Sequence, residues 1–141
     1  MKRLILIGVS GSGKTTLTEA LRGEKLEYRK TQYVNYSEDI IDTPGEYAED
    51  NDLGGALAVY SYEADVVGLV LSATAEFSSF PPACAPLANR PVIGIVTKCD
   101  AEGARADLAA MRLADTGADP IFITSAFSNV GITDILDFLC L

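Results

Sequence analysis

Short apolar runs, separated by stretches with helical spacing, constrain the fold of this chain more than any other feature. Leu4–Ile7 is apolar at every position, and Val66–Ser72 and Val92–Thr97 form two further continuous runs. Runs of this length and composition indicate strands that are buried on both faces of a sheet. Between them, apolar residues recur every three or four positions, which indicates amphipathic helices.

Buried strands that alternate with helices predict parallel β–α–β units with right-handed crossovers. The fold class is therefore α/β, with a mostly parallel sheet of about six short strands and helices on both faces, in a single domain. The expected strands are residues 4–7, 33–36, 39–42, 66–72, 92–97 and 121–123. The expected helices are residues 14–21, 53–62, 104–116 and 132–141. In such sheets ligands bind beyond the carboxyl ends of the strands, so we expect the functional residues there.

The segment after the first strand has the sequence of a phosphate-binding loop. Gly8-Val9-Ser10-Gly11-Ser12-Gly13-Lys14-Thr15 fits G-x-x-x-x-G-K-[ST] at every position. Glycines permit a backbone whose successive amides face an anion, and the start of the next helix adds its positive dipole end. Lys14 is expected to reach the β- and γ-phosphates, and the Thr15 hydroxyl to ligate Mg²⁺. The expected phosphate-binding residues are Gly8, Ser10, Gly11, Ser12, Gly13, Lys14, Thr15 and Thr16.

A second functional segment begins where the strand at residues 39–42 ends. Asp42 is predicted to hold Mg²⁺, usually through water, and the amide of Gly45 to bond the γ-phosphate. Thr31, in the loop before this region, is predicted to close over the metal and the γ-phosphate, and Ser37 and Thr43 compete for that role. Gly45 and Thr31 thus join the phosphate-loop lysine as the residues expected to act on the γ-phosphoryl group.

Residues after the last two strands are predicted to recognise the base. Asp100 can accept hydrogen bonds from N1–H and N2–H₂ of guanine, whereas N1 of adenine is an acceptor and would face the carboxylate unpaired. The stem of Lys98 can lie along the base plane, and Thr97 precedes it at the strand end. Ser125 and Ala126 follow the strand at 121–123, where a backbone amide can bond the guanine O6. The pattern predicts GTP over ATP.

Composition excludes several other classes of function. The net charge of −9 opposes nucleic-acid binding, because phosphate backbones require a basic footprint. The chain has no histidine, so Cys/His zinc sites and Ser–His–Asp or Cys–His catalysis are excluded. The three cysteines, Cys84, Cys99 and Cys140, are expected to be reduced apolar fillers of a cytoplasmic protein. The apolar segment near the amino terminus is too short for a signal peptide or a membrane span.

The order of these motifs resembles that of the Ras-like GTPase superfamily, over nearly the whole chain. A closer resemblance is to the ethanolamine/propanediol-utilisation family of small P-loop proteins (EutP/PduV). It rests on the minimal length, the early phosphate loop, Lys30-Thr31-Gln32 shortly before Ile40-Ile41-Asp42-Thr43-Pro44-Gly45-Glu46-Tyr47, and Ser125-Ala126-Phe127. The resemblance implies a Ras-like sheet, cytosolic nucleotide binding and a link to bacterial microcompartments that process ethanolamine or 1,2-propanediol. Shell or enzyme proteins of the compartment are the partners it implies.

Three positions depart from the Ras-like pattern. Thr97 stands where the superfamily usually has the Asn that braces the phosphate loop, and Ser10 replaces a common glycine. Glu46 stands where Ras-like enzymes carry the glutamine that positions water. A carboxylate beside the γ-phosphate adds like charge, so we expect weak intrinsic turnover.

Three functions fit these motifs. The first is a slow GTPase whose loops around Thr31 and Gly45 order on the γ-phosphate. The second is a small-molecule kinase that passes phosphoryl from ATP or GTP to a short carboxylate such as acetate. The third is a non-catalytic adaptor gated by nucleotide.

Overall fold

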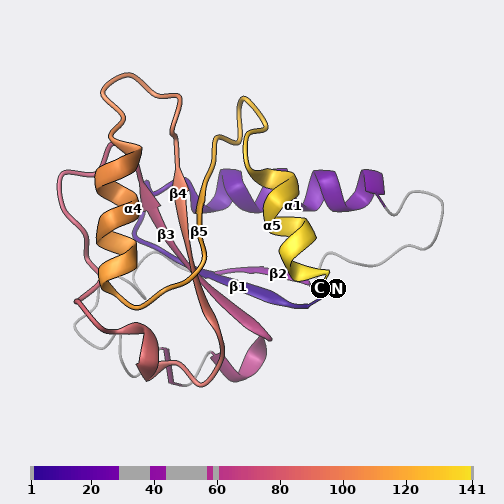
Figure 1. The fold of residues 1–141 in the computed structure, drawn as a ribbon. Coiled ribbons are helices and arrows are strands. Elements are labelled where there is room, and N and C mark those ends of the chain that lie inside the picture. Colours follow the sequence, from indigo (N-terminus) through magenta and orange to yellow (C-terminus); the bar gives the residue numbers. More distant parts are fainter. Residues whose placement is uncertain (1, 29–38, 44–56, 59–60, 141) are drawn as a thin grey trace.

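The computed structural model describes residues 2–28, 39–43, 57–58 and 61–140. Its described strands form one parallel sheet in the order β2-β1-β3-β4-β5 (Figure 1). These strands are β1 (Leu4–Ile7), β2 (Ile40–Asp42), β3 (Val66–Ser72), β4 (Val92–Thr97) and β5 (Ile121–Ile123). β1 is fully buried at all four positions, as its unbroken apolar sequence predicts.

The register of the sheet brings the carboxyl ends of its strands to one edge. Leu6 of β1 pairs with Asp42 on one side and Gly68 on the other. Farther along the sheet, Ser72 at the end of β3 pairs with Thr97 at the end of β4. The segments that leave these strands therefore begin close together, at the edge where open α/β sheets bind ligands.

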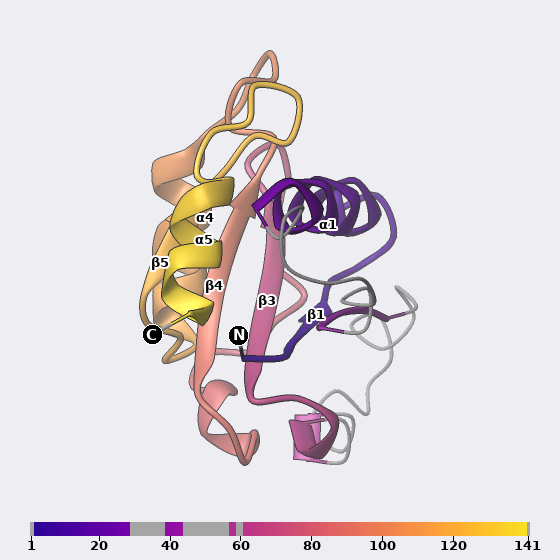
Figure 2. The ribbon, with the colours of Figure 1, turned by 90° about the vertical axis from the view of Figure 1, so that its right-hand side faces the viewer.

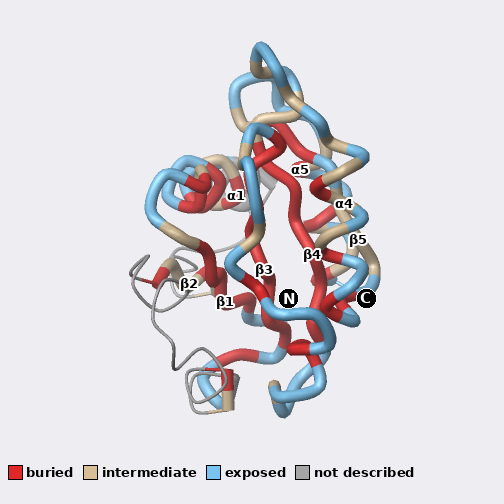
Figure 3. Tube along the Cα trace, turned by 90° about the vertical axis from the view of Figure 1, so that its left-hand side faces the viewer, coloured by how far each residue is buried: buried red, intermediate tan, exposed pale blue. Residues whose placement is uncertain are grey.

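Helices cover both faces of the sheet. α1 (Lys14–Tyr28) and α5 (Ile132–Leu139) lie on one face, and α4 (Ala106–Asp115) lies on the other (Figures 1 and 2). Side chains of α1 and α5 pack with alternate strand residues in one core, and those of α4 pack with the remaining ones in a second core. Figure 3 shows the strands as a buried layer between these helices, whose outer sides are exposed. Each fully buried leucine or isoleucine contributes roughly 1.5–3 kcal/mol to this packing.

Short segments complete the described chain. Two single-turn 3-10 helices, η1 (Ser61–Glu63) and η2 (Ala85–Leu87), precede β3 and β4. The Lys2 amide donates to the Leu139 carbonyl at 2.8 Å, which joins the start of β1 to the end of α5. Across residues 2–28, 39–43, 57–58 and 61–140, no helix has the length and apolarity that a membrane crossing requires.

The α/β class, the parallel sheet and the helices on both faces are confirmed, while the strand number and several element ends differ in detail. The described sheet has five strands instead of about six, and the strand expected at 33–36 lies outside the described residues, as does most of the helix expected at 53–62. α1 runs seven residues beyond its expected end at Leu21, because the single interior glycine, Gly23, costs only about 1 kcal/mol. All three cysteines are free, and Cys140 is exposed instead of a core filler.

Candidate nucleotide-binding site

The predicted phosphate loop leaves β1 and enters α1 at the ligand-binding edge of the sheet. The Ser12 amide donates to the Val9 carbonyl at 3.1 Å, which closes a turn within the loop. Gly11 and Gly13 have φ of 81° and 87°, the left-handed region that glycine adopts without strain. A Cβ on Gly13 would also lie 3.1 Å from the Thr97 hydroxyl oxygen. Left-handed residues in such a loop are typical of anion-binding nests.

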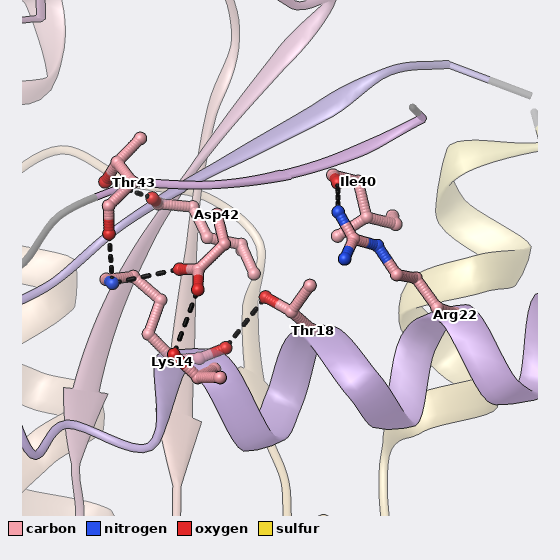
Figure 4. Close-up of polar contacts among 8 residues, drawn as sticks. Lys14, Thr18, Arg22, Ile40, Asp42 and Thr43 are labelled. Atoms are coloured by element: carbon pink, nitrogen blue, oxygen red, sulfur yellow. Dashed lines mark hydrogen bonds and ion pairs between the residues drawn. The ribbon is translucent and has the colours of Figure 1, made fainter. Parts of the chain in front are cut away.

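Lys14 extends from the first turn of α1 to the end of β2. Its ammonium lies 2.9 Å from Oδ1 of Asp42 and also donates to the Thr43 carbonyl (Figure 4). The Lys14 side chain is only 7% exposed, so these oxygens are what compensates its buried charge. Two segments that are 28 residues apart in sequence are thereby joined by the cation predicted to hold a triphosphate.

Thr15 and Asp42, two of the three predicted metal ligands, are in direct contact. The Thr15 hydroxyl donates to Oδ2 of Asp42 at 2.9 Å, while the other carboxylate oxygen faces the Lys14 ammonium. Mg²⁺ prefers oxygen ligands and is usually held by one or two protein groups together with phosphate oxygens and waters. A hydroxyl beside a carboxylate at the end of a phosphate loop fits that preference. Among the described residues, no three or more His, Cys, Asp or Glu side chains are grouped where they could hold a metal ion.

Thr43 is joined to β1 instead of being available to a metal. Its hydroxyl donates to the Leu6 carbonyl at 2.7 Å, and the side chain is buried. Of the three hydroxyls that competed for the position over the γ-phosphate, Thr43 is therefore committed elsewhere in this structure. Thr31 and Ser37 lie outside the described residues, as does Gly45.

The end of β4 braces the phosphate loop from the other side. The buried Thr97 hydroxyl donates to the Ser12 carbonyl, and Nζ of Lys98 donates to the Gly11 carbonyl at 2.7 Å. The shorter threonine thus supports the loop where the Ras-like pattern has asparagine. These two bonds fix the distance between the phosphate loop and the predicted base-binding residues.

The predicted base-binding residues surround one small hollow. It is lined by Thr16, Lys98, Asp100, Ser125 and Ala126, together with Gly13, Leu17, Thr97, Thr124 and Phe127. The sequence motifs at the ends of β1, β4 and β5 are therefore brought together, as predicted.

Two serine hydroxyls stabilise the ionised form of the Asp100 carboxylate. Hydrogen bonds from Ser125 and then Ser128 lower the pKa of Asp100 from its ordinary value of 3.8. Ser128 donates to Oδ2 of Asp100 at 2.9 Å, and its own amide donates to the Ser125 hydroxyl at 3.2 Å. An ionised carboxylate is the form that accepts two hydrogen bonds from guanine.

Sequence reasoning missed Ser128 and Arg22. The only available signal for Ser128 was its position three residues after Ser125, which matches a turn closed by a serine side chain. Arg22 donates to the Ile40 carbonyl at 2.7 Å, which ties α1 to the amino end of β2 (Figure 4). No motif marks Arg22, because its role depends on how the helix lies against the sheet.

Comparison with known proteins identifies the family. The PduV-EutP family model, described as ethanolamine utilisation - propanediol utilisation, matches residues 1–141. The chain belongs to the PduV-EutP family. The propanediol utilization protein PduV of Citrobacter freundii is 48% identical over 140 residues, which cover 99% of this chain and 93% of that protein. The proteins named probable acetate kinase EutP from Salmonella typhimurium and Escherichia coli K12 are 34% and 33% identical over 144 residues, covering 99% of this chain and 89% of each.

Membership of the PduV-EutP family confirms the resemblance seen in the motifs. It associates the chain with proteins of propanediol and ethanolamine utilisation. The family match covers the phosphate loop, the Lys14–Asp42 pair and the hollow beside Asp100 alike.

Proposed function

We propose that this PduV-EutP protein binds a purine nucleoside triphosphate with Mg²⁺, prefers guanine, and slowly hydrolyses the γ-phosphoryl group. One observation carries the proposal. The Lys14 ammonium, the Thr15 hydroxyl and the Asp42 carboxylate meet at the end of a glycine loop that leaves a buried strand. This combination places a positive charge and two metal-ligating oxygens in direct contact. The adjacent glycine loop supplies backbone amides that suit an anion.

Triphosphate binding requires an exchange of partners at Lys14. Its ammonium would leave Asp42 and the Thr43 carbonyl for the β- and γ-phosphate oxygens. Asp42 and Thr15 would then hold Mg²⁺, which supplies charge neutralisation of the phosphates. The ion pair thus keeps both charged groups compensated until the ligand arrives, and makes nucleotide affinity strongly dependent on the metal.

Guanine preference rests on Asp100. Its ionised carboxylate, which hydrogen bonds from Ser125 and Ser128 stabilise, would accept from N1–H and N2–H₂ of guanine. Adenine would leave that carboxylate facing an acceptor nitrogen, which would weaken its binding relative to guanine. GTP is therefore the expected substrate, with ATP as the weaker ligand.

Slow turnover follows from the sequence around the γ-phosphate. The chain has no histidine to act as a base, and Glu46 takes the position of the water-positioning glutamine. The protein would act where the family's pathways operate, in the cytoplasm at a microcompartment for ethanolamine or propanediol, with shell or enzyme proteins as partners.

A second candidate reaction is phosphoryl transfer to a short carboxylate. It is favoured by the name probable acetate kinase given to the EutP relatives. A carboxylate is already ionised at neutral pH, so its attack on phosphorus requires no proton removal. This reaction would therefore depend less on a catalytic base than hydrolysis, in which water must be activated.

A titration of GTP and ATP, each with Mg²⁺, tests nucleotide binding and base preference. Asp100→Ala should lower the affinity for GTP at least about 100-fold, since two hydrogen bonds to a charged group are lost. The affinity for ATP should stay nearly unchanged. Asp115→Ala, at the exposed end of α4, is the matched control and should change neither. Equal affinities for both nucleotides that Asp100→Ala does not alter would reject guanine recognition.

Trapping with hydroxylamine, with phosphate release followed in parallel, separates the two reactions. Hydroxamate that forms only with added acetate or propionate would establish the kinase. Phosphate release that is indifferent to carboxylate would establish the hydrolase.

A further inference from the structure

Among the described residues, the most exposed large apolar side chain lies at the candidate base site. Phe127 is 88% exposed, and it lines the hollow beside Asp100. A single apolar side chain on a surface is ordinary, so its exposure alone indicates nothing. Phe127 differs because it stands among the residues predicted to bind a base, and because an aromatic ring has a face on which a base can stack.

A hydrogen-bonded turn fixes the place of Phe127 relative to Asp100. The turn joins β5 to α5 and lies beside the loop that follows β4 (Figures 1 and 2). The amides of Ser125 and Val130 each donate to the carbonyl of the other at 3.0 Å, which closes the turn. Within it, the Ser128 amide donates to the Ser125 hydroxyl at 3.2 Å. Phe127 is therefore held between two serines whose hydroxyls are both bonded to the carboxylate predicted to read the base.

The hollow beside Asp100 is too small to enclose a base. Its volume is about 40 Å³, whereas pockets that enclose drug-sized ligands measure roughly 300–1,000 Å³. A purine that bonds to Asp100 through its edge would therefore keep most of its ring system outside the hollow. Residues at the rim are then the ones that can cover the faces of the base. Among the described residues that line the hollow, Phe127 alone is aromatic.

Lys98 adds an aliphatic surface to the same lining. Its Nζ donates to the Gly11 carbonyl at 2.7 Å, so its methylene stem is stretched from the end of β4 toward the phosphate loop. A stem held in this way presents an apolar surface to a planar ring. The lining therefore combines an aliphatic stem, an aromatic ring and a carboxylate, which are groups that hold a base by its faces and by its edge.

We propose that Phe127 stacks on the face of the purine base and strengthens nucleotide binding without setting base preference. This inference rests on the proposed nucleotide binding and adds a binding residue to that site. Stacking on an aromatic ring is open to every base, because each base has a π face, whereas hydrogen bonds along the base edge distinguish guanine from adenine. Asp100 therefore discriminates between GTP and ATP, and Phe127 raises the affinity for both.

Substitutions at Phe127 test the contact by titration with GTP, ATP and inorganic tripolyphosphate, each with Mg²⁺. Phe127→Ala should lower the affinities for GTP and ATP alike, at least about 10-fold, and Phe127→Tyr should keep them within about 2-fold. Tripolyphosphate has no base, so its affinity should change in neither variant. Tyr62→Ala is the matched control, because Tyr62 is 66% exposed and precedes β3, at the edge of the sheet opposite the site. It should bind all three ligands as the wild type does.

Fluorescence gives a second, direct readout of stacking. The chain has no tryptophan, so Phe127→Trp introduces a single indole at the proposed contact. A guanine that stacks on an indole quenches its fluorescence. GTP should therefore quench the emission of Phe127→Trp, with saturation at the Kd that calorimetry gives for the same variant. Tyr62→Trp places the indole away from the site and should show no saturable quenching.

Calorimetry of the wild type with GTP separates failure of this inference from failure of nucleotide binding. If the wild type binds GTP and Phe127→Ala binds it equally well, the stacking assignment is overturned while the nucleotide site stands. The assignment is also overturned if the affinity for tripolyphosphate falls together with that for GTP, because the substitution then acts through the phosphate loop. It is supported if Phe127→Ala loses affinity for both nucleotides alone and GTP quenches Phe127→Trp. If the wild type binds no nucleotide, the proposed function and this inference fall together.

Discussion

Replacing Asp42 by Asn removes one negative charge from the centre of the site while keeping its shape. The amide oxygen can still accept from the Lys14 ammonium, and the amide nitrogen can face the Thr15 hydroxyl. The attraction between charges 2.9 Å apart is about 6 kcal/mol at an effective dielectric constant of about 20. Desolvation offsets most of it. Asp42 is 26% exposed, so we expect a loss of about 2–3 kcal/mol of stability, below the roughly 3–5 kcal/mol for fully buried pairs.

The same substitution should reduce the stimulation of nucleotide binding by Mg²⁺. Without the metal, the wild-type carboxylate competes with phosphate for Lys14 and repels the triphosphate, so Asp42→Asn should bind GTP about 10-fold more tightly. With Mg²⁺, the variant lacks the anionic ligand and should bind GTP more weakly than the wild type. The ratio of the GTP Kd in EDTA to that in Mg²⁺ should therefore fall at least about 10-fold.

Thermal unfolding and a fluorescent-GTP titration measure these two effects. A loss of about 2–3 kcal/mol lowers Tm by roughly 6–9 °C in a chain of this size. Asp115→Asn, at an exposed helix end, is the control and should change neither quantity. Thr15→Val should lose Mg²⁺ stimulation with a smaller fall in Tm, which covers the case that Asp42→Asn folds poorly. An unchanged Tm together with unchanged Mg²⁺ stimulation in Asp42→Asn would refute the reasoning.

Three further predictions concern the base side of the site. Thr97→Val leaves the Ser12 carbonyl without its donor. The free energy of unfolding in denaturant should fall by about 1–3 kcal/mol, and the affinities for GTP and ATP should fall alike. A loss of affinity for GTP alone would contradict the bracing role of Thr97. Ser128→Ala should raise the pKa of Asp100 toward its ordinary value, as followed by carboxyl ¹³C NMR, and an unmoved titration would show that the Ser128 bond is absent in solution. Because the folded pKa of Asp100 is lowered, its bonds to Ser125 and Ser128 stabilise the protein above the unfolded pKa and are lost as pH falls through the folded pKa. The preference for GTP over ATP should therefore be constant from about pH 8 to pH 5, and a decline within that range would count against an ionised Asp100.

The strands were predictable because their residues are buried on both faces. Leu4–Ile7, Val66–Ser72 and Val92–Thr97 have the predicted bounds, since an unbroken apolar run leaves little choice of register or exposure. Helix ends were less predictable. α1 continues through Gly23 because the cost of one glycine is small beside the packing of a helix on a sheet.

In the site, residues fixed by backbone geometry were predictable, and residues fixed by tertiary approach were not. The spacing of the phosphate loop was sufficient to place Lys14 and Thr15, and the end of a strand placed Asp42 beside them. Ser128 and the unpartnered hydroxyl of Ser12 depend on how separate loops meet after folding. No local sequence pattern predicts these contacts between loops.

Calorimetric titration of the full chain with GTP and Mg²⁺ tests the central claim most directly. The account predicts heat that saturates at one GTP per chain, weaker binding of ATP, and loss of binding in Lys14→Ala. The absence of heat with either nucleotide, in folded wild-type protein, would contradict it.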